Sequence, residues 1–392
     1  MAVKIVRQPY RIALIGAATS AAALSAGREK APAALRAAGI VDRLKSAGYD
    51  IADAGDDVPQ VHQPDEASPR ARNLAGVVAS IESLKPRVEQ AVKSGALPLI
   101  LGGDCSIALA VVAGLRRYFR KVGVIYMDHD ADLHTPSTTT SGCLDGMVVS
   151  HLTGRGAAEL VRFWGDPPLV REPDLALFGF GRLDPAEEGV LRQAPLRRYA
   201  ASDVQRMGPG VAAEEAINRI HGGGAEFVLH MDVDVISDFP ASDFPASGGL
   251  NLEDVRRALA VFARQKHLAA IEVTGYNPVK DPDGSGAKLI VGLLAEVLEN
   301  RLAALRADSS PPIAGQGDGS DRPSAEAAPT HATSAANSAA SDDQSSGRAT
   351  EAIVQVEASS DPLEGRPTSA DQSDPSIENH AGETSGADES GA

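Results

Sequence analysis

The sequence has few cysteines, no long apolar run and no excess of basic residues, and each absence excludes a class of protein. Only two of the 392 residues are cysteines, Cys105 and Cys143, which excludes a disulfide framework and predicts a reducing, cytoplasmic location. No apolar run is long enough to span a membrane, so no membrane partner is expected. The formal net charge of −16 argues against nucleic acid as a partner.

The acidic excess is concentrated at one end of the chain. Residues 307–392 contain sixteen acidic and three basic residues, a balance of −13, so residues 1–306 are nearly neutral at −3. The acidic segment consists mainly of Ser, Ala, Asp, Gly, Pro and Thr, and it cannot bury enough apolar surface to offset its ordering entropy. We therefore predict a folded domain over residues 1–306 and a disordered acidic tail over residues 307–392.

Before this tail, apolar runs of strand length alternate with amphipathic stretches of helix length. Strands are expected over Ile12–Gly16, Pro98–Gly102, Val122–Met127, Leu175–Gly179, Phe227–Met231 and Leu268–Val273. Helices are expected over Ala75–Lys93 (interrupted or kinked at Pro86), Ile107–Arg120, Met147–Trp164, Ala212–Ile220, Leu252–Gln265 and Ala287–Leu305. The first apolar stretch follows Lys4, Arg7 and Arg11 and could be mistaken for a signal peptide, but the alternation favours a strand. The pattern predicts an α/β fold: a three-layer αβα architecture around a mostly parallel, doubly wound sheet.

Acidic or thiol side chains follow three of these strands, at the points where ligands bind in parallel sheets. The clusters are Gly102-Gly-Asp-Cys105-Ser106, Asp128-His-Asp130-Ala-Asp132 and Asp232-Val-Asp234. Alternate residues of an extended chain point the same way, so each aspartate set directs its carboxylates into one space. A single Asp-x-Asp is typical of a solvated loop or a helix cap. The three clusters together predict a divalent metal site, possibly binuclear, because unpaired buried carboxylates repel each other.

Over residues 9–305 the sequence resembles the ureohydrolase family of arginase, agmatinase and formiminoglutamase. Gly102-Gly-Asp-Cys-Ser106 is similar to the family's Gly-Gly-Asp-His-Ser, and Asp128-His-Asp-Ala-Asp132 to its Asp-Ala-His-x-Asp. Further similarity lies in Gly27-Arg-Glu-Lys-Ala-Pro-Ala-Ala-Leu-Arg36, Ser141-Gly-Cys-Leu-Asp-Gly-Met147, Asp232-Val-Asp234 and Asn277-Pro278. The resemblance implies the arginase-like αβα fold and homo-oligomers, trimers or hexamers.

The resemblance also implies two bridged manganese ions and a role for each aspartate. Asp128 and Asp232 would bridge the ions, Asp132 would bind the first ion, and Asp234 the second. A hydroxide held between the ions would attack a guanidinium or formimino carbon. Asp132 would then carry the proton to the leaving amine.

Four positions around the expected reaction centre depart from the family pattern. Cys105 and Asp130 stand where the family has metal-binding histidines, Asp145 where it has a histidine associated with proton transfer, and Gly275 where a glutamate holds the guanidinium. The expected ligands become Cys105, Asp128, Asp130, Asp132, Asp232 and Asp234. The five aspartates carry −5 against +4 from two divalent ions, which favours Mn²⁺ or Mg²⁺, whereas a thiolate prefers Zn²⁺ or Fe²⁺. One resolution is that Cys105 stays protonated and the first site is weak or empty; Ni²⁺ is not excluded either.

Candidate substrate contacts lie beside these ligands. His134 and Cys143 replace two contacts to the substrate carboxylate, Ser141 is kept, and Asp184 would face the amino end of the substrate. Three histidines lie near the aspartates and could replace lost ligands. Strand parity directs His129 away from the cluster, whereas His134 and His230 share the parity of the aspartates. A disulfide between the two cysteines is weakly supported in a cytoplasmic chain.

The sequence therefore predicts a metal-dependent hydrolase of a non-peptide C–N bond in a small guanidino or formimino compound, with Asp132 and Asp145 as catalytic residues. The alternative is a catalytically silent protein of the same fold that binds a metal or a small ligand. Loss of both metal-binding histidines favours this alternative, while retention of the aspartates favours continued metal binding.

Overall fold

The structure is a computed structural model of the whole chain, and it describes residues 5–220, 225–245 and 247–309. Residues 310–392 of the predicted acidic tail lie outside the described residues, whereas residues 307–309 belong to the last described helix. The last described helix ends at Ser309, close to the predicted domain boundary at residue 306, which itself stays a prediction.

The centre of the described chain is a sheet of eight parallel strands in the order β2-β1-β3-β8-β7-β4-β5-β6. The strands are β1 (Arg11–Gly16), β2 (Asp50–Asp56), β3 (Leu97–Leu101), β4 (Val122–Met127), β5 (Leu175–Phe178), β6 (Arg197–Tyr199), β7 (Glu226–Asp232) and β8 (Leu268–Thr274). The four strands β3, β8, β7 and β4 are consecutive neighbours. Their carboxyl ends therefore lie side by side at one edge of the sheet.

Helices connect the strands and end near the boundaries that the apolar periodicity indicates. The α-helices are α1 (Ala31–Ala37), α2 (Ile40–Ser46), α3 (Leu74–Lys93), α4 (Ile107–Arg116), α5 (Val148–Leu152), α6 (Ala158–Arg162), α7 (Pro185–Gln193), α8 (Ala201–Met207), α9 (Pro209–Ile220), α10 (Leu252–Ala263) and α11 (Ser285–Ser309). Short 3-10 helices are η1 (Arg28–Lys30), η2 (Asp145–Met147), η3 (Glu172–Asp174), η4 (Val233–Val235) and η5 (Pro278–Lys280).

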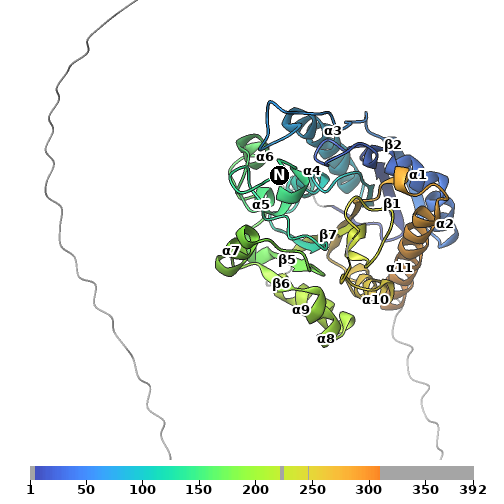
Figure 1. Cartoon of the computed structure of the whole chain (residues 1–392). Coiled ribbons are helices and arrows are strands. Elements are labelled where there is room, and N and C mark those ends of the chain that lie inside the picture. Colours follow the sequence, from blue (N-terminus) through green and yellow to red (C-terminus); the bar gives the residue numbers. More distant parts are fainter. Residues whose placement is uncertain (1–4, 221–224, 246, 310–392) are drawn as a thin grey trace, which may run out of the picture. The chain divides into compact units, whose positions relative to one another are not determined.

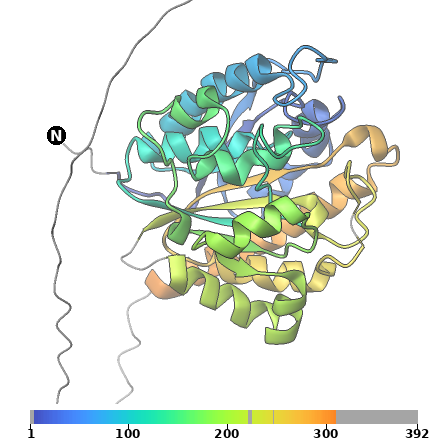
Figure 2. The same ribbon diagram turned by 60° about the vertical axis from the view of Figure 1, so that its left-hand side comes forward.

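Helices cover both faces of the sheet. Residues of α1, α2, α8, α9, α10 and α11 belong to one apolar cluster, and residues of α3, α4, α5, α6 and α7 belong to a second. Figure 2 shows the blue and teal helices α3 and α4 on one side of the sheet and the yellow helix α10 on the other. The predicted three-layer αβα fold with a parallel sheet is confirmed.

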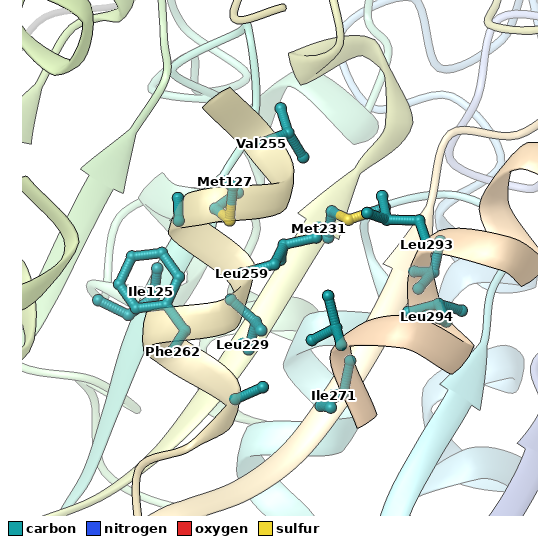
Figure 3. Packing of buried hydrophobic residues seen from close by; sticks show 14 of the residues in the cluster. Ile125, Met127, Leu229, Met231, Val255, Leu259, Phe262, Ile271, Leu293 and Leu294 are labelled. Atoms are coloured by element: carbon teal, nitrogen blue, oxygen red, sulfur yellow. The ribbon is translucent and has the colours of Figure 1, made fainter. Parts of the chain in front are cut away.

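Along the central strands beneath the site, apolar core residues alternate with polar residues. Figure 3 shows side chains of β4, β7 and β8 packed against α10 and α11: Ile125, Met127, Leu229, Met231 and Ile271 against Val255, Leu259, Phe262, Leu293 and Leu294. The intervening residues Tyr126, His230 and Glu272 have the opposite parity and point to the other face of the sheet. One face of these strands thus packs against α10 and α11, while the other carries polar groups near the site together with core residues such as Val124 and Val228.

The structure differs from the sequence expectations in several elements, including four short helices that were not predicted, α1, α2, α7 and α8. The edge strands β2 and β6 were not predicted, because β2 has the acidic sequence Asp-Ile-Ala-Asp-Ala-Gly-Asp and β6 has only three residues. The helix expected over Met147–Trp164 is wrong: it divides into α5 and α6, with Gly154 and Gly156 at positive φ between them. Helix α3 continues through Pro86.

No helix among the described residues combines the length and the apolar character needed to cross a membrane.

Candidate metal centre and active site

The register of the sheet places polar residues of three strands in rows. Tyr126 of β4 lies beside His230 of β7, and His230 lies beside Glu272 of β8. Two residues further along, Asp232 lies beside Thr274. Because alternate residues of a strand point to the same face, the second row extends the first toward the carboxyl ends. The carboxylates at the strand ends therefore stand directly above a row of buried polar side chains.

All eleven residues that the sequence predicted for the site line one pocket of about 390 Å³. They are Cys105, Asp128, Asp130, Asp132, His134, Ser141, Cys143, Asp145, Asp184, Asp232 and Asp234. Arg28, Arg182 and Phe244, to which the sequence assigned no role, line the same pocket. Their placement in one pocket supports a single site, while the role of each residue stays a prediction.

Three buried aspartates form the centre of the site. Asp128, Asp232 and Asp234 each direct one carboxylate oxygen into a group whose oxygens lie within 4.8 Å of one another. Burial and then the neighbouring carboxylates raise the pKa of Asp128 and of Asp234 well above the usual value. A divalent cation would offset both effects, and carboxylate oxygens suit a hard ion. The donor set therefore fits a bound divalent metal.

Backbone N–H groups orient these carboxylates. Asp128 Oδ1 accepts a hydrogen bond from the Asp130 N–H (2.7 Å), and Asp232 Oδ1 accepts one from the Asp234 N–H (2.8 Å). Asp234 Oδ1 accepts a hydrogen bond from the His129 N–H (3.2 Å). Each carboxylate thus has one oxygen bound by the backbone, which fixes its orientation, and a second oxygen directed elsewhere.

A second group of possible ligands lies on the sheet side of the cluster and consists of Cys105, Asp128 and His230. The Cys105 thiol donates to Asp232 Oδ2 at 3.0 Å. Burial, followed by the charges of Asp145 and Asp232, raises the pKa of Cys105 well above its usual range. The thiol is therefore protonated unless a cation binds beside it. Both cysteines are free, so the weakly supported disulfide does not form in this structure.

The opposite side of the cluster is neutralised by an arginine. Arg182 Nε lies 2.8 Å from Asp130 Oδ1, and Arg182 Nη2 lies 3.7 Å from Asp234 Oδ2. Burial raises the pKa of Asp130 to about 6, although Arg182 acts in the opposite direction. Asp130 belongs to neither group of three, because its carboxylate turns toward this guanidinium.

A second arginine lies inside the pocket. Arg28 is 2% exposed, and its guanidinium binds Asp145 Oδ2 through Nη1 (2.6 Å) and Asp243 Oδ2 through Nε (2.9 Å). Burial alone would lower the pKa of Arg28, but the carboxylates of Asp145 and Asp232 keep it well above the usual value. The guanidinium groups of Arg28 and Arg182 lie 6.0 and 5.7 Å from the ring centre of Phe244. The chain therefore brings two of its own cations to the carboxylate cluster.

The two predicted proton carriers are both engaged by neighbours. Asp145 accepts the Cys105 N–H on Oδ1 (2.7 Å) and Arg28 on Oδ2. Asp132 has a left-handed backbone (φ +50°) and accepts the Tyr126 hydroxyl on Oδ2. Asp132 also belongs to neither group of three possible ligands. Proton transfer by either residue remains a prediction, and Asp145, with both oxygens engaged, would first have to exchange one of these hydrogen bonds.

The predicted substrate contacts form one wall of the pocket. His134 Nε2 lies 3.0 Å from Asp184 Oδ2, and Asp184 Oδ1 caps α7 by accepting the N–H groups of Ala186 and Glu187. Ser141 Oγ accepts the Cys143 N–H at 3.2 Å. Asp184 is therefore fixed by helix capping, while its other oxygen and the His134 ring face the pocket.

Gly275 leaves no space for a larger side chain. Its φ is +79°, and a Cβ atom built there would lie 2.1 Å from Asp232 Oδ1. A carboxylate at this position, as the family pattern has it, would require the backbone to change. The sequence therefore lacks the carboxylate that would hold a guanidinium, and the backbone at Gly275 has no room for one.

Sequence analysis assigned no role to several residues of the site, and only one of them, Glu272, carries a sequence signal. Glu272 is an acidic residue inside the apolar run Leu268–Val273, whereas Arg28 is the first of three consecutive charged residues and does not stand out from its neighbours. Both are fully or almost fully buried, which requires partners. Phe244 lies in an irregular segment and has no signal that we can identify.

Comparison with known proteins agrees with this geometry. The model of the Arginase family matches residues 10–299. The arginase of Bacillus caldovelox is 30% identical over 298 residues, covering 74% of this chain and 99% of that protein. The crystal structure of arginase from Bacillus cereus superposes with a TM-score of 0.66 at 28% identity, over 74% of this chain and 98% of that one. The agmatine ureohydrolase of Thermoplasma volcanium shares the fold, with a TM-score of 0.56 at 18% identity over 78% and 95% of the two chains. This chain belongs to the arginase family.

Proposed function

We propose that the protein is a metal-dependent hydrolase of a non-peptide C–N bond in a small guanidino or formimino compound. The observation that carries the proposal is the buried group of Asp128, Asp232 and Asp234 at the base of a pocket that holds all the predicted site residues. Membership of the arginase family supports the reaction class. The identity of the substrate is a more specific proposal, which rests on the pocket residues described below.

Two divalent ions, Mn²⁺ by resemblance to the family, would bind among Cys105, Asp128, Asp130, Asp132, Asp232 and Asp234. When bound, such a pair activates water near neutral pH and polarises the substrate. Asp128 belongs to both groups of possible ligands, and Asp232 contacts both Cys105 and Asp234, which suits the bridging role that the family resemblance implies. Tyr126 holds Asp132 in place through its hydroxyl.

The substrate would enter along the wall formed by His134, Ser141 and Asp184. The carboxylate of Asp184 and the ring of His134 would bind the polar end remote from the reacting carbon. Arginine is a poor candidate because Gly275 cannot supply the carboxylate that holds a guanidinium. A smaller or less basic amidine is favoured.

Release of urea or ammonia from a panel of guanidino and formimino compounds tests the proposal. The full chain should be loaded separately with Mn²⁺, Ni²⁺, Zn²⁺ and Fe²⁺, and Asp128→Asn is the control variant. We expect turnover that depends on metal and is lost in the control. Less than one bound metal per chain together with no turnover would overturn the proposal.

One observation favours the second candidate, a catalytically silent protein of the same fold. The buried Arg28 guanidinium already occupies the pocket and engages Asp145, a predicted catalytic residue. This candidate predicts metal binding without turnover in any metal form. A cytoplasmic location, inferred from the low cysteine content, and assembly into trimers or hexamers, implied by the family resemblance, remain proposals. Light scattering of the full chain would measure the assembly.

A further inference from the structure

Tyr126 of β4, His230 of β7 and Glu272 of β8 are arranged like a metal-binding histidine and the residues that orient it. His230 and Glu272 are both 0% exposed, and His230 Nδ1 lies 2.8 Å from Glu272 Oε1. The ring of Tyr126 stacks on the His230 ring with a 4.1 Å centroid distance and an interplanar angle of 3°. Glu272 thus occupies one ring nitrogen and Tyr126 fixes the ring plane. A histidine held by a carboxylate in this way is the usual arrangement of a metal ligand.

The other nitrogen of His230 is directed toward the carboxylate cluster. Thr274 Oγ1 lies 3.4 Å from His230 Nε2 and 3.4 Å from Cys105 Sγ. Ligand atoms of Cys105, Asp128 and His230 lie within 4.8 Å of one another, and all three residues are buried. A thiol, a carboxylate and an imidazole therefore surround one point on the sheet side of Asp128.

We propose that Cys105, Asp128 and His230 form a thiolate–carboxylate–imidazole site for a divalent ion of the Zn²⁺ class, with Glu272 as the positioning residue for His230. The inference deepens the proposed metal centre and rests on it. On binding, the Cys105 S–H bond breaks, its proton passes to solvent, and the sulfur electron pair binds the ion. The hydrogen bond from Cys105 to Asp232 is then lost, which leaves that Asp232 oxygen available to the ions.

The chemistry of the ligands distinguishes this position from the Asp128, Asp232 and Asp234 group. Sulfur and nitrogen donors select Zn²⁺, Co²⁺ or Fe²⁺, whereas carboxylates alone suit Mn²⁺ or Mg²⁺. The two groups share Asp128. The centre would therefore hold two different metals, a soft ion next to the sheet and a hard ion next to the solvent.

Cobalt spectroscopy of the full chain tests the inference without relying on turnover. Titration of the wild-type protein with Co²⁺ should produce a thiolate-to-cobalt charge-transfer band in the near ultraviolet that saturates at one ion per chain. Cys105→Ser should abolish the band, whereas Cys143→Ser should retain it. A wild-type spectrum without the band overturns the inference. This outcome is measured on the wild-type protein alone and does not depend on whether a variant folds.

Variants of the histidine row test the proposed positions. Glu272→Gln should weaken Co²⁺ binding by about 10- to 100-fold, and His230→Gln, which removes a ligand, should weaken it more. His129→Gln is the matched control, because His129 lies beside the same aspartates but its ring contacts Gly181 and Gly249. Circular dichroism establishes that each variant is folded. Unchanged Co²⁺ affinity in a folded His230→Gln protein overturns the role of His230.

The inference and the proposed function can fail separately. A cobalt–thiolate band in a protein that turns over no substrate supports the site and counts against the hydrolase. Turnover with Mn²⁺ in a protein without the band supports the hydrolase and overturns the site.

Discussion

The two sides of the carboxylate cluster are built differently. On the sheet side, Cys105 and His230 are buried, and the sheet register sets the position of His230. On the solvent side, Asp130 is paired with Arg182, whose side chain is 42% exposed. The sheet side is therefore built to be rigid and selective for its ion. The solvent side can exchange an arginine for a cation.

The largest effect is expected from the buried arginine. Arg28→Met removes the buried cation that pairs with Asp145 and with Asp243, although Asp243 keeps Lys280, so we expect the free energy of unfolding to fall by about 3–5 kcal/mol. Urea denaturation measures this loss. Adding Asp145→Asn and Asp243→Asn to the variant should restore part of the stability, and no recovery would show that the loss comes from packing.

Asp128 is common to both groups of ligands, so its removal should affect both metal positions. Asp128→Asn should weaken binding of Co²⁺ and of Mn²⁺ by more than about 100-fold, because even outer partners of metal ligands typically contribute 10- to 100-fold. Chelator competition measures both affinities. Asp234→Asn is the matched variant and should weaken Mn²⁺ much more than Co²⁺; equal losses would remove the distinction between the two sides.

The pH dependence of the metal-free protein should be opposite to that of the metal-bound protein. Burial raises the pKa of Asp130 from 3.8 to about 6, so the folded state binds more protons than the unfolded state between about pH 4 and 6. Stability of the metal-free protein should therefore fall as pH rises through this window, and the raised pKa values of Asp128 and Asp234 extend the fall to higher pH. Saturating metal should reverse the trend, since the ion requires ionised carboxylates. Thermal melts with chelator and with Mn²⁺ check both slopes.

The smallest effect is expected from the exposed arginine. Arg182→Met removes a partly exposed ion pair, so the free energy of unfolding should change by about 1 kcal/mol or less. Freed from Arg182, Asp130 should bind Mn²⁺ more tightly, by roughly fivefold at most on the same energy scale. Calorimetric titration measures the gain, while Co²⁺ affinity serves as the internal control. A loss of Mn²⁺ affinity would mean that Arg182 organises the site rather than competing for Asp130.

Sequence reasoning located the fold and the pocket because both follow from local patterns. The strands before Asp128 and Asp232 are apolar runs with clear ends, and parallel neighbours bring their carboxyl ends together. The strand β2 was missed because an acidic edge strand lacks that pattern. Arg28 could not be assigned because its partner Asp243 lies 215 residues away, and no local spacing indicates such a contact.

The row formed by Tyr126, His230 and Glu272 also limits how this protein can change in evolution. Insertion or deletion of a single residue within β7 would exchange His230 with an apolar neighbour such as Met231, because successive side chains of a strand point to opposite faces. The same event would bring the imidazole into the apolar core and a methionine into the metal centre. Substitutions at the rim of the pocket carry no such penalty, so descendants of this chain should vary in substrate far more readily than in the length of this strand.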